Sequence, residues 1–304
     1  MPAWEGRSKA KPLGYKIFVG ILKKAGVGPA YLLLRFVALY YFFFSYKSSK
    51  HTFNYFHKRL CYGTVKSVYK VYQNYNLLGQ SIIDKVVVMA GIKNKLTFEL
   101  DGVNNLHKIA AMKKGGLLLT AHIGNWEAAS HLLTDLDSRI NIVTFDGEDS
   151  GIKEYLETVT GESKINFIAI KEDMSHIFKI SEAFLENELV CLPADRFLEG
   201  TKTVAMDFLG EKANFPIGPF LLACKFKVPV TFVYGMKEST YHYHFFSSEV
   251  KDYSDMDMEA ASQHILQDFV EYMENKVKKY PEQWYNYYNF WKPSEPTQTK
   301  NFQN

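Results

Sequence analysis

The sequence predicts an α/β domain in which a mostly parallel sheet is flanked by helices. Its 304 residues, 47% of them hydrophobic, are enough to form the core of one large domain. From about residue 96 onward, short apolar runs typical of buried strands alternate with stretches in which apolar residues recur at helical spacing. This β–α–β order is typical of parallel sheets with helices on both faces.

Composition excludes several classes of protein. With 23% charged and 47% hydrophobic residues, the chain is neither disordered nor fibrous. A net charge of +3, without a dense basic run interleaved with aromatic residues, gives no indication of a nucleic-acid partner. Aromatic residues make up 15% of the chain, which fits either a surface at a lipid interface or an aromatic-rich core.

The cysteines indicate the compartment. Cys61, Cys191 and Cys224 are far apart and form no CxxC pair, so neither a disulfide framework nor a zinc site is expected. A reducing compartment that faces the cytosol follows from this usage.

The amino-terminal residues predict a membrane-associating helical segment, residues 1–60, ahead of the α/β domain at 61–304. The run Val27–Phe44 has Arg35 as its only charge and spans about 27 Å as a helix, so a single membrane span is geometrically allowed. Arg35 lies near the middle of the run, however, and basic residues flank it on both sides. We therefore favour a helix lying in the membrane interface, with a single span as the alternative.

The remaining elements follow in order along the chain. Residues 52–91 are expected to be helical, and the alternation of Leu96, Phe98 and Leu100 predicts a short half-buried strand. Further strands are expected at 116–121, Ile140–Phe145, Ile165–Ile170, Leu189–Pro193 and 229–234, and helices at 126–136, 154–160, 175–187 and 217–226. An antiparallel strand at 241–250 and a long amphipathic helix at Met258–Lys279 complete the domain.

The sharpest chemical signal follows the strand at 116–121. The strand ends in His122, a turn contains Gly124, and Glu127 begins a helix five positions after the histidine. The carboxyl ends of strands in an open α/β sheet are where reacting groups gather, so His122 is expected in a crevice. Such a histidine can act as a general base, and a carboxylate can hold its tautomer, which assigns these roles to His122 and Glu127. The alternative is a structural histidine followed by a helix-capping glutamate.

This segment, residues 115–127, resembles the catalytic block of the late acyltransferases of lipid A biosynthesis, within the lysophospholipid and glycerol-phosphate acyltransferase superfamily. The family block has a histidine, four residues and then Asp or Glu, as in His122 and Glu127. Further blocks that resemble the family occur in family order at 75–84, 193–196, 208–210, 216–223 and 280–284.

The resemblance implies a glycerol-phosphate acyltransferase-like fold and an acyltransferase domain at 61–304. It implies transfer of a fatty acyl group from a thioester to a hydroxyl of a membrane lipid, such as a lipid A precursor, without a cofactor. The implied donor is an acyl-acyl carrier protein, for which the basic amino-terminal region is a plausible docking surface, with acyl-coenzyme A as the alternative. The expected location is the cytoplasmic face of the inner membrane.

Four residues beside the pair are candidates for substrate binding. Asp195 and Arg196 follow the strand Leu189–Pro193 and are expected at the same sheet edge as His122. Arg196 is expected to bind a phosphate or the thioester oxygen. The alternative is that Asp195 and Arg196 form a plain surface salt bridge with each other. Asn125 and the amides near Gly124 are candidate oxyanion donors.

The chain departs from the family pattern near its end. Where family members usually have a basic, Arg-containing stretch, residues 285–291 read Tyr-Asn-Tyr-Tyr-Asn-Phe-Trp. Fewer basic residues weaken contact with a phosphorylated sugar, so the acceptor stays open. An aminoacyl lipid and a polyene pigment precursor are the alternative acceptors.

Two functions from other classes compete with acyl transfer. One is a catalytically silent lipid-binding protein, against which the intact His122 and Glu127 argue. The other is a metal-dependent hydrolase that uses His122 with His242 or His244, but no third ligand is evident and no metal site is expected. Motifs of serine hydrolases, P-loop proteins and dinucleotide-binding enzymes are absent from the sequence.

Overall fold

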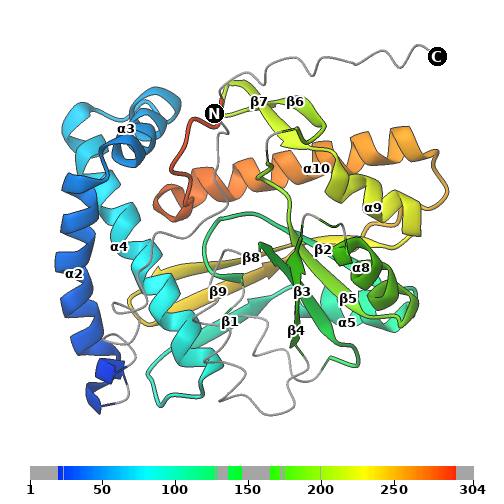
Figure 1. Ribbon diagram of the computed structural model, residues 1–304, viewed down its shortest axis with the longest axis horizontal. Helices are drawn as coiled ribbons and strands as arrows, with labels where there is room; N and C mark the ends of the chain where they lie inside the picture. The colour runs from blue at the N-terminus through cyan, green and yellow to red at the C-terminus, as the bar shows by residue number, and fades with distance from the viewer. Residues whose placement is uncertain are drawn as a thin grey trace.

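The computed structural model describes residues 20–291 except residues 23, 127, 129–135, 146–164, 172, 174 and 199. Its centre is a seven-stranded sheet with the strand order β1-β9-β8-β2-β5-β3-β4 (Figure 1). The strands are β1 (Thr97–Asp101), β2 (Gly116–Thr120), β3 (Ile140–Phe145), β4 (Ile165–Ile170), β5 (Leu189–Pro193), β8 (Val230–Ser239) and β9 (His242–Ser247). Every neighbouring pair is parallel except β8 and β9. The predicted fold class, a mostly parallel sheet flanked by helices, is confirmed.

Apolar cores cover both faces of the sheet. Leu117 and Leu119 of β2 belong to one core, while Leu118 belongs to the other, because successive side chains of a strand point to opposite faces. Helices that contribute side chains to the first core include α8 (Ser175–Leu185), α9 (Gly218–Phe226) and α10 (Met258–Lys279). The second receives side chains from α5 (Val103–Ala111). Burial on both faces explains why the central strands read as continuous apolar runs.

Residues 52–91 are mostly helical, as predicted, but the helices are interrupted at residues 60–63, which the sequence did not indicate. Helix α2 (Val27–Phe44) leads into α3 (Tyr46–Asn54) and a π-helical turn, Tyr55–Arg59, and α4 (Thr64–Met89) begins only after a break. Cys61 has a positive φ of 54°, a left-handed conformation that no helix continues through. The break lets α4 turn back and lie beside α2 at one end of the sheet (Figure 1).

A β-hairpin that was not predicted lies between β5 and α9. Strands β6 (Thr203–Phe208) and β7 (Glu211–Pro216) pair antiparallel in a separate two-stranded sheet. The two turn residues, Leu209 and Gly210, have φ values of 51° and 79°. Positive φ at both central positions is typical of the tight two-residue hairpin turn, whose twist matches that of the strands.

Several predicted boundaries are confirmed. Strands β3, β4 and β5 and helix α10 have the predicted bounds, and β9 pairs antiparallel with β8 as expected. Helix α10 begins where the Asp257 side chain accepts hydrogen bonds from the backbone N–H groups of Glu259 and Ala260. Helix α5 was not predicted, β1 is mostly exposed rather than half-buried, and the helices expected at 126–136 and 154–160 fall almost wholly outside the described residues.

Candidate active site

The site forms where the two central strands β2 and β5 end. Their parallel register places Thr120 opposite Pro193, so the residues two positions further along, His122 and Asp195, meet. The ring Nδ1 of His122 lies 2.7 Å from Oδ1 of Asp195, and the His122 backbone N–H lies within 3.2 Å of both carboxylate oxygens. Because an ionised carboxylate only accepts hydrogen bonds, Nδ1 carries the proton in this arrangement.

The carboxylate of this pair is buried and ionised. Asp195 is 1% exposed, and burial alone would raise its pKa. The hydrogen bonds from His122, the charge of its protonated form and the charge of Arg196 together outweigh that effect, so the pKa of Asp195 lies below its usual range. The His122 side chain keeps 19% of its surface exposed, so the ring is reachable while its partner is not.

The segment that carries the histidine, residues 121–126, is named here the catalytic loop. Gly124 has a φ of 65°, and a Cβ atom at this position would lie 2.0 Å from the carbonyl oxygen of Gly235. The amide of Gly124 donates to the carbonyl of Gln283 at 2.9 Å, and the amide of Asn125 donates to that of Gly235 at 2.6 Å. The loop is therefore held on one side by Gly235 of β8 and on the other by Gln283, and only glycine fits at its closest approach.

Gly124 and Asn125 follow His122 in the loop, and their donors are engaged within the protein. Besides the two amide bonds, the Asn125 side-chain Nδ2 donates to the carbonyl of Ser81 at 2.9 Å, and Asn125 is buried. These hydrogen bonds fix the position of the loop. The oxyanion role assigned to these residues stays a prediction that their hydrogen bonding does not favour.

The carboxyl-terminal segment, residues 281–291, packs against the backbone of His122. The amide of Tyr285 donates to the carbonyl of His122 at 2.9 Å, and Nη2 of Arg196 donates to the carbonyl of Tyr285 at 2.5 Å. Arg196 thus lies at the predicted edge and is held by this segment. The side chains of Trp284, Tyr285 and Phe290 are each at most 5% exposed. The aromatic stretch at residues 285–291 therefore packs largely against the core.

Sequence reasoning did not identify Asp195 as the partner of His122. Glu127, to which that role was assigned, lies outside the described residues, and its role stays a prediction. The signal for Asp195 was present: each of two apolar strands is followed by a polar residue at the second position, His122 after Thr120 and Asp195 after Pro193. Only the strand order shows that these two strands are neighbours.

The other histidine candidates, His242 and His244, both lie on β9 and pair with polar residues of the neighbouring strands β1 and β8. His242 Nδ1 lies 2.8 Å from the Thr97 hydroxyl, and His244 Nδ1 lies 3.4 Å from a carboxylate oxygen of Glu238. Among the residues that the structure describes, no group of three or more His, Cys, Asp or Glu side chains is arranged to hold a metal ion.

A parallel α/β sheet with a histidine–carboxylate pair at its carboxyl edge is typical of an enzyme that uses histidine as a base. The chain belongs to the bacterial lipid A biosynthesis acyltransferase family, whose family model matches residues 59–293. It is therefore an acyltransferase, and the resemblance seen in the sequence is confirmed.

Similar proteins of known structure add little beyond this. The crystal structure of the 1-acyl-sn-glycerophosphate (LPA) acyltransferase PlsC from Thermotoga maritima is similar at 15% identity and a TM-score of 0.37. The similarity covers 82% of this chain and 97% of that chain. No curated protein matches the chain.

Proposed function

We propose that the protein transfers a fatty acyl group from an acyl thioester to a hydroxyl of a membrane lipid, with His122 as the general base. The observation that carries the proposal is the His122–Asp195 pair at the carboxyl edge of the sheet, in a chain of this family. Asp195 holds Nδ1, so Nε2 is the nitrogen that exchanges protons with the substrate.

The proposed reaction needs no covalent enzyme intermediate. Nε2 of His122 takes the proton of the acceptor hydroxyl as its oxygen attacks the thioester carbonyl. The tetrahedral intermediate collapses, the C–S bond breaks, and the leaving thiolate takes the proton back from the imidazolium. Asp195 stabilises the imidazolium while it exists, because a buried ionised carboxylate faces its Nδ1–H.

Glu127 and Arg196 complete the proposal. Glu127 follows the catalytic loop in the sequence and is proposed as a second carboxylate that orients His122. Arg196 lies at the same edge, held by the carbonyl of Tyr285, and is proposed to bind a phosphate of donor or acceptor or the thioester oxygen.

The donor and acceptor are proposed from the family. The donor is an acyl-acyl carrier protein, with acyl-coenzyme A as the alternative, and the acceptor is a lipid A precursor. The aromatic composition of residues 285–291 keeps an aminoacyl lipid or a polyene pigment precursor as alternative acceptors. Reaction at the cytoplasmic face of the inner membrane is proposed, with residues 1–60 as the membrane-associating segment and 61–304 as the acyltransferase domain.

Release of free thiol from the donor by purified protein in detergent tests the function. We expect turnover that depends on added lipid acceptor and is faster with an acyl-acyl carrier protein than with acyl-coenzyme A. Binding of acceptor lipid without thiol release from either donor would instead indicate a silent lipid-binding protein. Lipid mass profiling of a strain that lacks the protein identifies the acceptor as the lipid that loses one acyl group.

Membrane association is supported by the outer face of α2. This helix is long and apolar enough to cross a membrane, but one side of it is buried against α4. Its other side exposes large apolar residues: Leu32, Phe36, Leu39, Tyr40, Phe43 and Phe44. Arg35 is exposed among them, and a charge at the centre of a bilayer is costly. An interfacial position, with the outer face in lipid and Arg35 reaching the headgroups, satisfies both features.

We expect the full-length protein to be released from membranes by alkaline carbonate and only partly by high salt, because apolar burial is not screened. Replacing Phe36 and Phe43, which are 65% and 69% exposed, with serine is expected to lower liposome binding by about tenfold or more. The control is Phe178→Ser, a residue that is 77% exposed on α8, and Figure 1 shows α8 on the opposite side of the view from α2. Complete retention of the wild-type protein in the carbonate pellet would establish the single span instead.

A further inference from the structure

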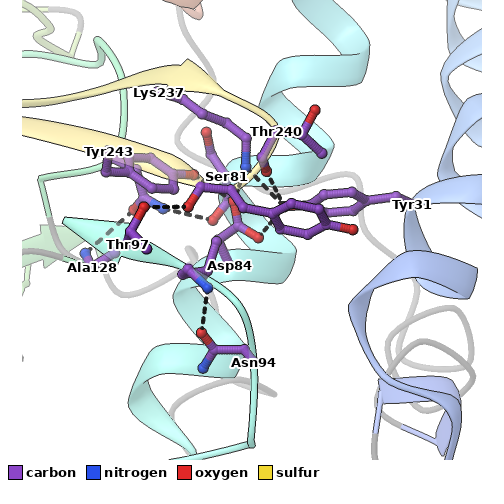
Figure 2. A network of polar contacts seen from close by, with 12 residues as sticks. Tyr31, Ser81, Asp84, Asn94, Thr97, Ala128, Lys237, Thr240 and Tyr243 are labelled. Atoms are coloured by element: carbon purple, nitrogen blue, oxygen red, sulfur yellow. Dashed lines mark hydrogen bonds and ion pairs between the residues drawn. The ribbon is translucent and has the colours of Figure 1, made fainter.

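A buried polar cluster joins four elements that lie far apart in the sequence: Tyr31 of α2, Asp84 of α4, Lys237 of β8 and Tyr243 of β9 (Figure 2). Asp84 is the centre of it and is fully buried. Tyr31 donates to one carboxylate oxygen, while the Lys237 ammonium and the Tyr243 hydroxyl donate to the other. Lys237 Nζ also donates to the Tyr31 hydroxyl at 2.8 Å.

Stability alone is a poor reason for such a cluster. A buried ion pair must overcome the desolvation of both charges, and apolar side chains of similar size often stabilise a core as well or better. A cluster whose buried charges are all hydrogen-bonded does, however, favour one arrangement of the elements that contribute to it.

One set of contacts leads from Asp84 through α4 to the catalytic loop. Ser81 lies one helical turn before Asp84, and its carbonyl accepts the side-chain amide of Asn125 at 2.9 Å. The Ser81 hydroxyl lies 2.9 Å from the hydroxyl of Tyr285, whose backbone amide donates to the carbonyl of His122. A displacement of this turn of α4 would therefore be transmitted to both ends of the loop.

A second set leads from Lys237 along its backbone. The amide of Lys237 donates to the side-chain carbonyl of Gln283 at 2.8 Å, and the Gln283 side-chain amide donates back to the Lys237 carbonyl at 2.7 Å. The Gln283 main-chain carbonyl in turn accepts the amide of Gly124. Along this second route, Gln283 alone connects Lys237 of the cluster to Gly124 of the catalytic loop.

The membrane-facing helix enters the cluster through a single side chain. Tyr31 lies on the inner side of α2, which packs so closely on α4 that a Cβ atom at Gly79 would lie 2.2 Å from Leu34 Cδ1. The opposite side of the same helix exposes its apolar residues. The Tyr31–Asp84 contact therefore connects α2, whose outer side is apolar, to the residues that hold the loop of His122.

We infer that Tyr31, Asp84, Lys237 and Tyr243 form a positioning cluster that couples the docking of α2 on α4 to the geometry of the catalytic loop. None of the four touches the His122–Asp195 pair in the contacts described, so they act on the reaction through Ser81, Gln283 and the loop. The cluster lets the enzyme hold its reacting groups correctly only while the membrane helix is docked.

Tyr31→Phe tests the inference because it removes one hydroxyl and keeps the ring that stacks on Tyr241. We expect backbone amide hydrogen exchange in residues 121–126 to become about tenfold faster. We also expect kcat for acyl transfer to fall by about three- to tenfold, with the KM for the donor within about twofold, because small displacements of reacting groups cost rate. Both are measured in the full-length protein in detergent, at a temperature where the variant is folded.

Tyr253→Phe is the matched control. Tyr253 donates to Asp268, which also accepts from Lys251 at 2.5 Å, so the same three residue types meet there. Lys251 pairs with Val230 at the start of β8, away from Gly235, which holds the loop. This variant is expected to lose stability without a change in loop exchange or kcat.

The inference would be overturned if folded Tyr31→Phe kept the wild-type loop exchange rate and kcat. It would also be overturned if Tyr253→Phe changed loop exchange and kcat as much as Tyr31→Phe does. Its kinetic readout rests on the proposed acyl transfer, whereas hydrogen exchange does not. If wild-type protein transfers no acyl group, the proposed function fails, and the exchange comparison still decides whether the cluster positions the loop.

Discussion

His122→Ala is expected to lower the rate of acyl transfer by about 10²–10⁴-fold while the protein stays folded. The loss follows from removing the only group proposed to take the acceptor's proton. Some stability should be lost, because the buried Asp195 carboxylate loses the ring as a partner, but the backbone hydrogen bonds of Gly124, Asn125 and Tyr285 still hold the loop. The measurement is kcat for thiol release and lipid acylation, with thermal unfolding as the check on folding. Near-normal turnover by the folded variant would rule out His122 as the base.

His242→Ala provides the matched control, because this histidine also lies at a strand of the sheet and pairs with Thr97 rather than with the site. Unchanged transfer is expected. Equal loss in both variants, together with metal bound to the purified protein, would favour the metal-dependent hydrolase over the acyltransferase mechanism.

Asp195→Asn is expected to have the second large effect, a fall in kcat of about 10²–10⁴-fold. An amide is close to the carboxylate in shape but carries no charge, and its NH2 group favours the wrong tautomer of His122, as in other histidine–aspartate pairs. In the variant, the imidazolium formed during proton transfer would have no counter-charge. The loss is large because the wild-type carboxylate is buried, where water screens its charge little. Steady-state kinetics of this variant, Glu127→Gln and Glu127→Asp compare how much kcat depends on each of the two carboxylates.

For Glu127 we expect a strong loss with glutamine and a smaller one with aspartate, which keeps the charge. If Asp195→Asn transferred at the wild-type rate while Glu127→Gln did not, Glu127 would be the orienting carboxylate. Equal activity of Glu127→Gln and wild type would reduce Glu127 to a helix cap.

Asp195→Asn should also alter how the stability of the protein depends on pH. The pKa of Asp195 is lower in the folded protein than in the unfolded chain, where it is about 3.9. Its stabilising contribution is therefore complete above the unfolded value and is lost as pH falls through the folded one. The difference in unfolding free energy between wild type and Asp195→Asn should accordingly shrink towards acid pH.

The sequence by itself determined the class of fold, much of the strand pattern and the histidine. The bounds of β3, β4, β5 and α10 follow from local features, since buried parallel strands read as apolar runs and Asp257 caps its helix. His122 stands out because its neighbours along the chain form a recognisable block. Local sequence was weaker where backbone conformation departs from the regular pattern, as at the break after the π-turn and at the Leu209–Gly210 hairpin.

The tertiary structure alone decided what surrounds that histidine. Asp195 lies 73 residues from His122 in the chain and reaches it because β5 is the spatial neighbour of β2. Asp84 and Lys237 are 153 residues apart, and their pairing depends on how α4 packs at the end of the sheet. Spacing and periodicity carry information over a few turns of helix or one strand. Strand order and helix packing are set by the burial of whole faces, which no local pattern contains.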